Sequence, residues 1–240
     1  MLSTKYKILS KFIKNRAGYW LFKRMVQLIY LFLGMSLLKE YILSLHSDLK
    51  ISLDIPPEIK NFEDLHWLFF STFLNRGIIK MDLDEAAYLF KTIRGGLPMH
   101  LLEIGTYKGG STMLISAAKP KEAEFVSLDL EDRCHPKVRE LLDKNTRLLR
   151  EDSRKFIPQN KLDFIFIDGE HSFEGIQADF EHYFSHLNKG ADILLHDAVR
   201  TRKYTFIATQ TNAFIKTIEK RRGLKFVKDV GTLRHLKKYD

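Results

Sequence analysis

From His100 onward, short apolar runs alternate with longer segments in which apolar residues recur at helical spacing. This alternation is typical of a mainly parallel sheet with helices on both faces. The predicted strands are His100–Ile104, Phe125–Asp129, Arg147–Arg150, Leu162–Ile167 and Ile193–Leu195, followed by Leu224–Val230 and Thr232–Leu236, which are joined through Gly231. The predicted helices are Ser111–Ala118, Pro136–Lys144, Phe173–Leu187 and Thr205–Arg222. The pattern therefore predicts an α/β fold: a doubly wound, mostly parallel, seven-stranded sheet with an antiparallel C-terminal hairpin.

Two segments precede this sheet. Residues 58–98 predict a helical lead-in, with Asp82 or Asp84 as the N-cap of a helix over residues 86–93. Residues 1–57 form a leader, which the Pro56-Pro57 pair separates from the rest of the chain. We therefore expect a leader over 1–57, a helical N-terminal extension over 58–98 and the main domain over 99–240.

The leader combines a basic stretch with an apolar one. Residues 1–24 hold seven Lys and Arg and no acidic residue, and residues 25–38 carry no charge. At fourteen residues, this uncharged stretch falls short of the roughly 20 that span a bilayer. The leader is therefore interpreted either as an interfacial anchor on an anionic membrane surface or as a helix packed on the domain or on a second subunit of a homo-oligomer, rather than as a spanning helix.

Beyond residue 24 the charges nearly balance, although the whole chain carries +9. The main domain therefore gives no electrostatic support for a nucleic-acid partner. A single cysteine excludes an internal disulfide, and a reducing compartment fits. We expect a cytoplasmic protein, or one held peripherally at the inner face of the membrane.

Acidic residues lie at or just past the C-terminal ends of five predicted strands. In an open α/β sheet the carboxyl ends of the parallel strands form the ligand crevice. These residues are Glu103, Asp129, Asp152, Asp168 and Asp197. Five acids placed alike predict a binding site at that edge of the sheet.

The first of these acids begins a glycine-rich turn, Glu-Ile-Gly-Thr-Tyr-Lys-Gly-Gly-Ser-Thr, over residues 103–112. Gly105 lets the backbone turn sharply, Gly109 and Gly110 leave space for a ligand, and Ser111 or Thr112 is expected to cap the following helix. A dinucleotide site would need a second glycine where Tyr107 stands, and this side chain would crowd a pyrophosphate. The turn therefore favours another nucleotide-like cofactor over NAD.

This turn resembles motif I of the class I S-adenosylmethionine-dependent methyltransferases, most closely the branch of small O-methyltransferases that includes the catechol and caffeoyl-CoA enzymes. The run from Phe164 to Gly175, then Leu187-Asn-Lys-Gly190 and Leu194-Leu-His-Asp197, is similar to a bacterial family marked by I-D-G-x-H, L-x-x-G-G and H-D. Ala191 replaces the second glycine of the middle motif. The resemblance covers about residues 75–240 and implies a Rossmann-like, S-adenosylmethionine-binding methyltransferase domain over 99–240.

The resemblance also implies which residues bind the cofactor S-adenosylmethionine. Around its methionine part it places Glu103, Gly105 and Tyr107, and Gly109 and Ser111 are further candidate cofactor-binding residues. Asp129 would bind both ribose hydroxyls, and Asp152 with Ser153 would lie at the adenine. The alternative for Asp152 and Ser153 is a helix cap.

His171 and Asp168 are the candidate catalytic residues. Methyl transfer requires the enzyme to position the acceptor and to remove its proton. His171 lies three residues after Asp168, where the catechol enzymes carry a lysine, and an imidazole suits a base near neutral pH. Alternatively, His171 is a structural histidine bonded to Asp179 or to a loop carbonyl.

A divalent metal, Mg²⁺ or Mn²⁺, is the second cofactor that the resemblance suggests. Asp168 and Asp197 would match two carboxylate ligands, but Ala198 stands where the catechol enzymes have a third, an asparagine. His196 is the preferred replacement, with Glu170 or His171 as alternatives. Otherwise Asp168, His171 and His196 form a polar cluster without metal.

Together these features predict an S-adenosylmethionine-dependent methyltransferase that acts on a hydroxyl of a small molecule, sugar or glycolipid precursor. Three other functions stay open. One is a non-catalytic binding or scaffold protein with the same fold, another a methyltransferase of nucleic acid or protein, and the third a dehydrogenase.

Overall fold

The computed structural model of the chain describes residues 55–56, 58–69, 77–201 and 209–240. The part from Ile55 to Asp240 is one compact unit. The expectations for residues 1–54 therefore lie outside the described residues. Within the ranges that the structure describes, no helix is both long enough and apolar enough to cross a bilayer.

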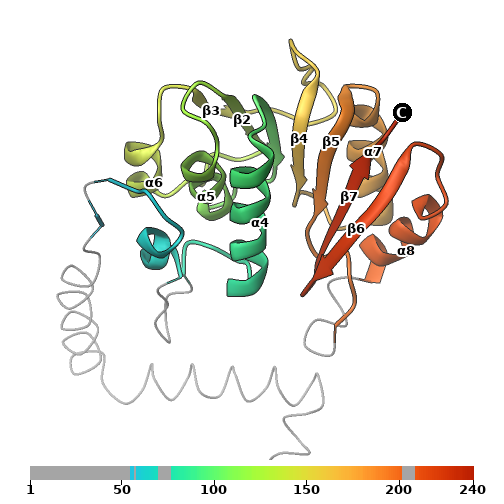
Figure 1. Cartoon of the computed structure of the whole chain (residues 1–240), viewed down its shortest axis with the longest axis horizontal. Coiled ribbons are helices and arrows are strands. Elements are labelled where there is room, and N and C mark those ends of the chain that lie inside the picture. Colours follow the sequence, from blue (N-terminus) through green and yellow to red (C-terminus); the bar gives the residue numbers. More distant parts are fainter. Residues whose placement is uncertain (1–54, 57, 70–76, 202–208) are drawn as a thin grey trace, which may run out of the picture. The chain divides into compact units, whose positions relative to one another are not determined.

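A seven-stranded sheet forms the centre of the described part, as predicted (Figure 1). Its strands are β1 (His100–Ile104), β2 (Glu124–Asp129), β3 (Thr146–Arg150), β4 (Leu162–Ile167), β5 (Leu187–Leu195), β6 (Leu224–Val230) and β7 (Leu233–Lys238). They lie in the order β3-β2-β1-β4-β5-β7-β6. The first five are parallel, whereas β7 runs antiparallel to both β5 and β6. The order reverses at β1 and β4, so the crevice of this sheet lies at their carboxyl ends.

The helices alternate with these strands. They are the 3-10 helix η1 (Glu63–Leu68) and the α-helices α4 (Leu83–Gly96), α5 (Gly110–Ala118), α6 (Pro136–Leu141), α7 (Phe173–Phe184) and α8 (Thr209–Ile218). Asp82 is the N-cap of α4 and forms a capping box with Glu85. This reciprocal pair satisfies two amides that a helix start leaves without partners.

Alternating side chains along the strands supply the two faces of the sheet. Leu102, Ile104 and Ile165 pack with Ile176 and Phe180 of α7, in one cluster that also contains Phe214 and Ile215 of α8. The intervening Glu103 meets Thr112 of α5 on the opposite face. Figure 1 shows α4 and α5 in front of the sheet, with α7 behind it. Helices on both faces confirm the doubly wound architecture.

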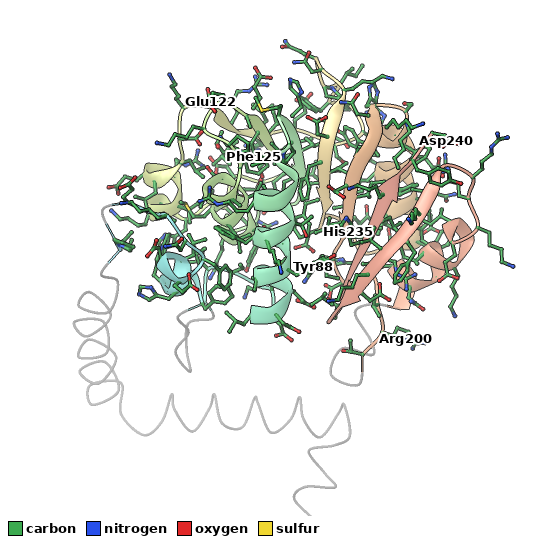
Figure 2. All side chains as sticks on the ribbon, in the orientation of Figure 1. Tyr88, Glu122, Phe125, Arg200, His235 and Asp240 are labelled. Carbon is green, nitrogen blue, oxygen red and sulfur yellow. The ribbon has the colours of Figure 1, made fainter. Side chains whose placement is uncertain are left out.

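A polar contact fixes α4 across the sheet. The Tyr88 hydroxyl lies 2.8 Å from Nδ1 of His235 in β7, and Nε2 of His235 lies 2.9 Å from Asp192 in β5. Figure 2 labels Tyr88 and His235 where α4 crosses the sheet. Buried polar groups paired in this way select one placement of the helix.

Several predicted boundaries differ from the structure, most of them by one or two residues, and four of the larger differences are these. Helix α7 ends at Phe184 instead of Leu187, and β5 begins at Leu187 instead of Ile193. Leu187 pairs with Leu162 of β4 and is buried, so it continues the sheet beyond a register shift. Because the residues after Leu187 are polar, the apolar pattern did not reveal where β5 begins. Helix α6 ends at Leu141, because Leu142 is already extended, and α8 ends at Ile218 instead of Arg222.

Candidate active site

A cleft of about 740 Å³ opens at the carboxyl ends of the parallel strands. Its wall includes the residues that end β1 and β2, the segments that follow β4 and β5, and residues 78–81 ahead of α4. Asp129, Asp152, Asp168 and Asp197 all line it. The structure thus brings together four of the five acids that the sequence placed at strand ends.

The glycine turn passes directly under Asp168. Gly105 has a φ of 101°, and a Cβ at this position would lie 2.2 Å from the carbonyl oxygen of Asp168. The Gly105 amide donates to Leu128 and the Asp168 amide donates to Ile104, each at 2.8 Å. Only glycine fits here, because the chain turns sharply after β1 and passes very close to the backbone of Asp168.

The second half of the turn differs from expectation. Gly109 is the N-cap of α5 and has a left-handed backbone, so neither Ser111 nor Thr112 caps this helix. A Cβ on Gly109 would meet Cys134 and Val138, so this glycine makes room for α6 and its approach instead of a ligand. Gly110 and Ser111 do line the cleft.

Tyr107 and Asp129 meet at the cleft wall. The Tyr107 amide donates to one Asp129 carboxylate oxygen at 2.7 Å, and the Glu131 amide donates to the other at 3.0 Å. Tyr107 has a φ of 44°, and its ring centroid lies 4.9 Å from the Arg133 guanidinium and 5.6 Å from the Lys80 ammonium. Backbone donors hold the Asp129 carboxylate in place, and a carboxylate has further acceptor capacity for vicinal hydroxyls.

Glu103 lies beneath the turn, whereas the sequence placed it beside a cofactor. Its side chain is 0% exposed, and one oxygen accepts from Thr112 and from Ser127, each at 2.5 Å. Burial raises the pKa of Glu103 to about 7, against the opposing effect of these hydroxyls and of Ser111. The carboxyl group therefore joins β1, β2 and α5 from inside and does not reach the cleft wall.

The loop after β3 carries Asp152 and Ser153 to the opposite part of the cleft. Asp152 accepts two side-chain hydrogen bonds from Arg154, each at 2.8 Å, and it also accepts from the Arg154 amide. These bonds lower the pKa of Asp152 to about 2. No helix lies between β3 and β4 in the described residues, so the helix-cap alternative for Asp152 and Ser153 is wrong, and both residues line the cleft.

Helix α7 holds this loop. Ser153 donates to Asp179 at 2.6 Å, and the Tyr183 hydroxyl donates to the Ser153 carbonyl at 2.5 Å. Asp179 is 4% exposed, and burial raises its pKa. Asp179 therefore pairs with Ser153. The alternative in which His171 is a structural histidine bonded to Asp179 does not match this pairing.

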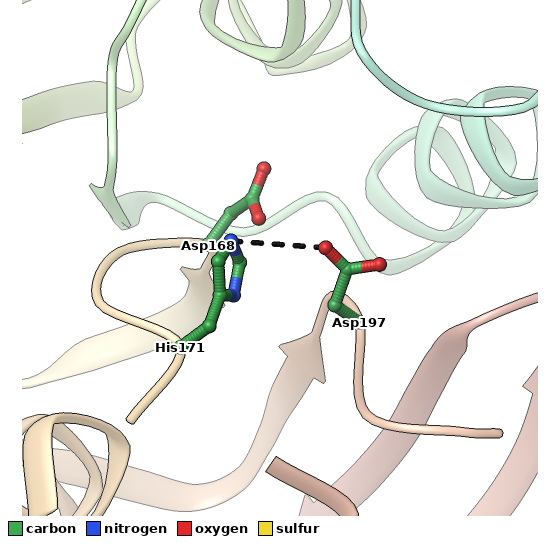
Figure 3. Close-up of side chains that lie close together, drawn as sticks. All are labelled: Asp168, His171 and Asp197. Carbon is green, nitrogen blue, oxygen red and sulfur yellow. Dashed lines mark ion pairs between the residues drawn. The ribbon is translucent and has the colours of Figure 1, made fainter. Parts of the chain in front are cut away.

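Asp168, His171 and Asp197 all line the cleft and lie close together (Figure 3). One ligand atom from each lies within 4.8 Å of the others, and Nε2 of His171 is 3.7 Å from the Asp197 carboxylate. Asp197 has a φ of 50°, and burial raises its pKa against the attraction of His196. The His171 side chain is 43% exposed, so it is accessible from the cleft. Two carboxylates and an imidazole form a donor set that suits a divalent cation.

His196 is not in the group of converging donor atoms, which differs from the preferred metal set and favours His171 as the third ligand. Its Nδ1 lies 3.1 Å from Asp168 and its Nε2 lies 3.2 Å from Glu85. Burial opposes the charged form, but Asp168 and Glu85 outweigh it and raise the pKa of His196 well above its ordinary value. Both ring nitrogens of His196 therefore already lie within hydrogen-bond distance of a carboxylate. Among the candidates for a third ligand, His171 is the one whose atoms converge with Asp168 and Asp197.

The sequence did not single out Glu85. This residue is 2% exposed and accepts from His196 and from both the amide and the hydroxyl of Thr232. Burial opposes its ionisation, but these donors lower its pKa to about 2. The Asp-x-x-Glu spacing ahead of an apolar helix could have identified Glu85 as part of a capping box, but not its contact with His196.

Residues 102–198 match a family model described as a methyltransferase domain. Among solved structures, an O-methyltransferase from Bacillus cereus in complex with SAH is 17% identical with a TM-score of 0.54, over 66% of this chain and 82% of that one. The O-methyltransferase TomG from Streptomyces achromogenes, in complex with SAM, is 15% identical with a TM-score of 0.53, over 67% and 82%. The methyltransferase PaMTH1 from Podospora anserina, bound to SAH, is 14% identical with a TM-score of 0.57, over 68% and 80%. These structures show the same fold. No curated protein sequence matches this chain significantly.

Proposed function

Residues 102–198 are a methyltransferase domain, and from this premise we propose that the protein transfers the methyl group of S-adenosylmethionine to a hydroxyl of a small molecule, sugar or glycolipid precursor. One observation carries the proposal. A single cleft is lined both by the glycine turn with Asp129 and by the cluster of Asp168, His171 and Asp197. The first feature suits a nucleoside cofactor, and the second suits a group that accepts a methyl and loses a proton.

The cleft residues fit S-adenosylmethionine better than a dinucleotide. Asp129 offers carboxylate oxygens to the ribose hydroxyls, and the loop with Asp152 and Ser153 offers polar groups to the adenine amino group. Gly105, Tyr107 and Ser111 border the part of the cleft left for the methionine. Tyr107 stands where a pyrophosphate would require glycine. The compared structures bound to SAM or SAH support this assignment.

Methyl transfer from a sulfonium is an in-line displacement. The acceptor oxygen forms a bond to the methyl carbon as the carbon–sulfur bond breaks, and the hydroxyl proton leaves. His171 is accessible and lies beside Asp197, so we assign it as the base that takes this proton. Asp168, hydrogen-bonded to His196, faces the same space and orients the acceptor hydroxyl.

A divalent cation, Mg²⁺ or Mn²⁺, fits the carboxylates of Asp168 and Asp197. Both line the cleft and carry oxygen donors, and such cations are commonly held by one or two carboxylates with water and substrate. Bound there, the cation would supply positive charge that lowers the pKa of an acceptor hydroxyl. In this assignment the two carboxylates hold the cation and His171 is the base. His171 cannot be both base and ligand, because a nitrogen bound to metal could not take a proton.

The acceptor class rests on the oxygen-rich centre of the cleft. A hydroxyl can donate to a carboxylate or bind a hard cation through its oxygen. It also has a proton that it can give to an imidazole. Two of the compared structures are named O-methyltransferases, which agrees with this choice. An anionic membrane surface and a second copy of the chain remain proposed partners through residues 1–57, with a cytoplasmic or peripheral location.

The direct test uses S-adenosylmethionine with a labelled methyl group, the full chain, Mg²⁺, and separate acceptor pools. The pools are catechols and phenolic acids, free sugars, glycolipids, RNA and protein. We expect label in a small-molecule or glycolipid pool, and loss of transfer with Asp168→Asn. Label that enters only RNA or protein would contradict the acceptor class. Cofactor binding with no transfer to any pool would favour a binding protein with this fold.

A further inference from the structure

Glu85 and His196 form a buried pair directly behind the candidate active site. Nε2 of His196 lies 3.2 Å from Glu85, and Nδ1 lies 3.1 Å from Asp168 and 3.7 Å from Asp197. The two side chains are 2% and 6% exposed. One imidazole therefore joins a carboxylate of α4 to both carboxylates of the cluster.

Glu85 also holds the backbone that carries Asp197. Its carboxylate accepts from the Thr232 amide at 2.5 Å and from the Thr232 hydroxyl at 2.9 Å. The Thr232 carbonyl in turn accepts from the amides of Ala198 and Val199, each at 2.9 Å. Asp197, with its positive φ, stands immediately before these two anchored amides.

Capping of α4 does not account for this arrangement. The capping box needs only the contact between Glu85 and the Asp82 amide, which is 2.9 Å long. The other three hydrogen bonds lead away from the helix, to His196 in the segment after β5 and to Thr232 in the turn between β6 and β7. Burying a carboxylate costs free energy unless hydrogen bonds satisfy it. These three bonds therefore let the Glu85 side chain join the helix to the backbone around the site.

We propose that Glu85 is a positioning residue, which acts through His196 and Thr232 to hold the Asp168 and Asp197 carboxylates at the spacing that binds a divalent cation. The inference rests on the proposed metal assignment. Glu85 does not line the cleft and so does not itself touch ligand. Glu85 and Thr232 both lie outside residues 102–198, the segment that matches the family model, so that match does not assign them a role.

The test measures binding of Mn²⁺ alone to the full chain, from the electron paramagnetic resonance signal of the free ion. Groups that orient metal ligands typically change metal affinity 10–100-fold when they are replaced. We expect Glu85→Gln to weaken Mn²⁺ binding at least tenfold, because the amide cannot accept from both Thr232 and His196. Calorimetric affinity for S-adenosylhomocysteine should change less than threefold.

Two control variants separate positioning from stability. Asp84→Asn neutralises the neighbouring exposed carboxylate of the same helix turn, and Leu89→Ala empties a fully buried position one turn further along α4. Both should bind Mn²⁺ as the wild type does, although Leu89→Ala should unfold more readily. Glu85→Asp, which keeps the charge and shortens the reach, should also weaken binding and replaces Glu85→Gln if that variant does not fold.

Equal Mn²⁺ affinity in wild type and Glu85 variants would overturn the inference. Equal weakening by Leu89→Ala would overturn it too, since general destabilisation would then explain the effect. A wild type that fails to bind Mn²⁺ would remove its basis. Failure to bind S-adenosylhomocysteine would instead count against the proposed function. The Mn²⁺ measurement would still test the role of Glu85, because it does not depend on the cofactor.

Discussion

The backbone amide of Tyr107 donates to the Asp129 carboxylate across 2.7 Å and so ties the glycine turn after β1 to the end of β2. The Glu131 amide holds the second carboxylate oxygen. Asp129 therefore has its orientation fixed before any ligand arrives, and no rearrangement is required for it to accept hydrogen bonds from a ribose.

Asp129→Ala should weaken S-adenosylhomocysteine binding by about 2 kcal/mol, or roughly 30-fold, because a charged hydrogen-bond acceptor is lost. Titration calorimetry measures the change directly. Asp132→Asn, three residues further along and paired with Arg139, is the matched control and should bind normally. An Asp129→Ala protein with wild-type affinity would remove Asp129 from the cofactor site.

Gly105→Ala should destabilise the fold strongly, because the added methyl would lie 2.2 Å from the Asp168 carbonyl oxygen at a φ of 101°. We expect a loss of about 3 kcal/mol or more in the free energy of unfolding. Gly190→Ala is the comparison, since Gly190 has a φ of 85° but nothing within 4 Å of an added Cβ. Backbone strain alone should lower its stability by about 1 kcal/mol. Similar losses in urea unfolding would show that the crowding at Gly105 is unimportant.

The alternation of apolar runs was enough to predict seven strands, their approximate positions and the C-terminal hairpin. It failed at β5, where Asn188, Lys189 and Gly190 interrupt the apolar pattern although the backbone already pairs with β4. Strand pairing is a tertiary interaction, so a window of local sequence does not contain it. Helix ends were misplaced for the same reason at Phe184 and Leu141.

The site was predictable where it depends on strand ends. Asp129, Asp168 and Asp197 line the cleft because parallel strands deliver their carboxyl ends to one edge. The sequence could not show that Glu103 turns inward or that His196 uses both nitrogens, because Thr112, Ser127 and Glu85 decide these orientations. Such contacts join residues that lie as many as 111 positions apart.

Glu103 should make stability depend on pH. Burial raises its folded pKa to about 7, above the ordinary value of 4.5, so the folded state binds its proton more tightly than the unfolded state. Stability should therefore fall as pH rises from about 4.5 to about 7, by about 3 kcal/mol for this group. Glu103→Gln should remove that part of the pH dependence in urea unfolding, while Glu122→Gln at an exposed position should keep it. Parallel profiles for wild type and Glu103→Gln would exclude the raised pKa.

His171→Asn should lower methyl transfer about 100-fold or more, as expected when a general base is removed. Its affinities for S-adenosylhomocysteine and for Mn²⁺ should stay within threefold of wild type. The exposed His66→Asn is the control. Unchanged turnover would make His171 structural, and a large loss of Mn²⁺ affinity would make it a metal ligand instead of the base.

Replacing Lys5, Lys7, Lys11 and Lys14 by glutamine should reduce co-sedimentation of the full chain with phosphatidylserine vesicles, since each basic residue near an anionic surface contributes about 1 kcal/mol. Binding to neutral phosphatidylcholine vesicles should be weak for both proteins. If the substituted chain sediments with anionic vesicles as the wild type does, the leader is not an electrostatic anchor, and a helix packed on protein becomes the better interpretation.

The central claim is that the cleft binds S-adenosylmethionine and uses it for methyl transfer. Titration calorimetry of the full chain with S-adenosylhomocysteine and, separately, with NAD tests the binding on which everything else depends. We predict saturable binding of one S-adenosylhomocysteine per chain and no heat of binding with NAD. Binding of NAD without binding of S-adenosylhomocysteine would contradict the account.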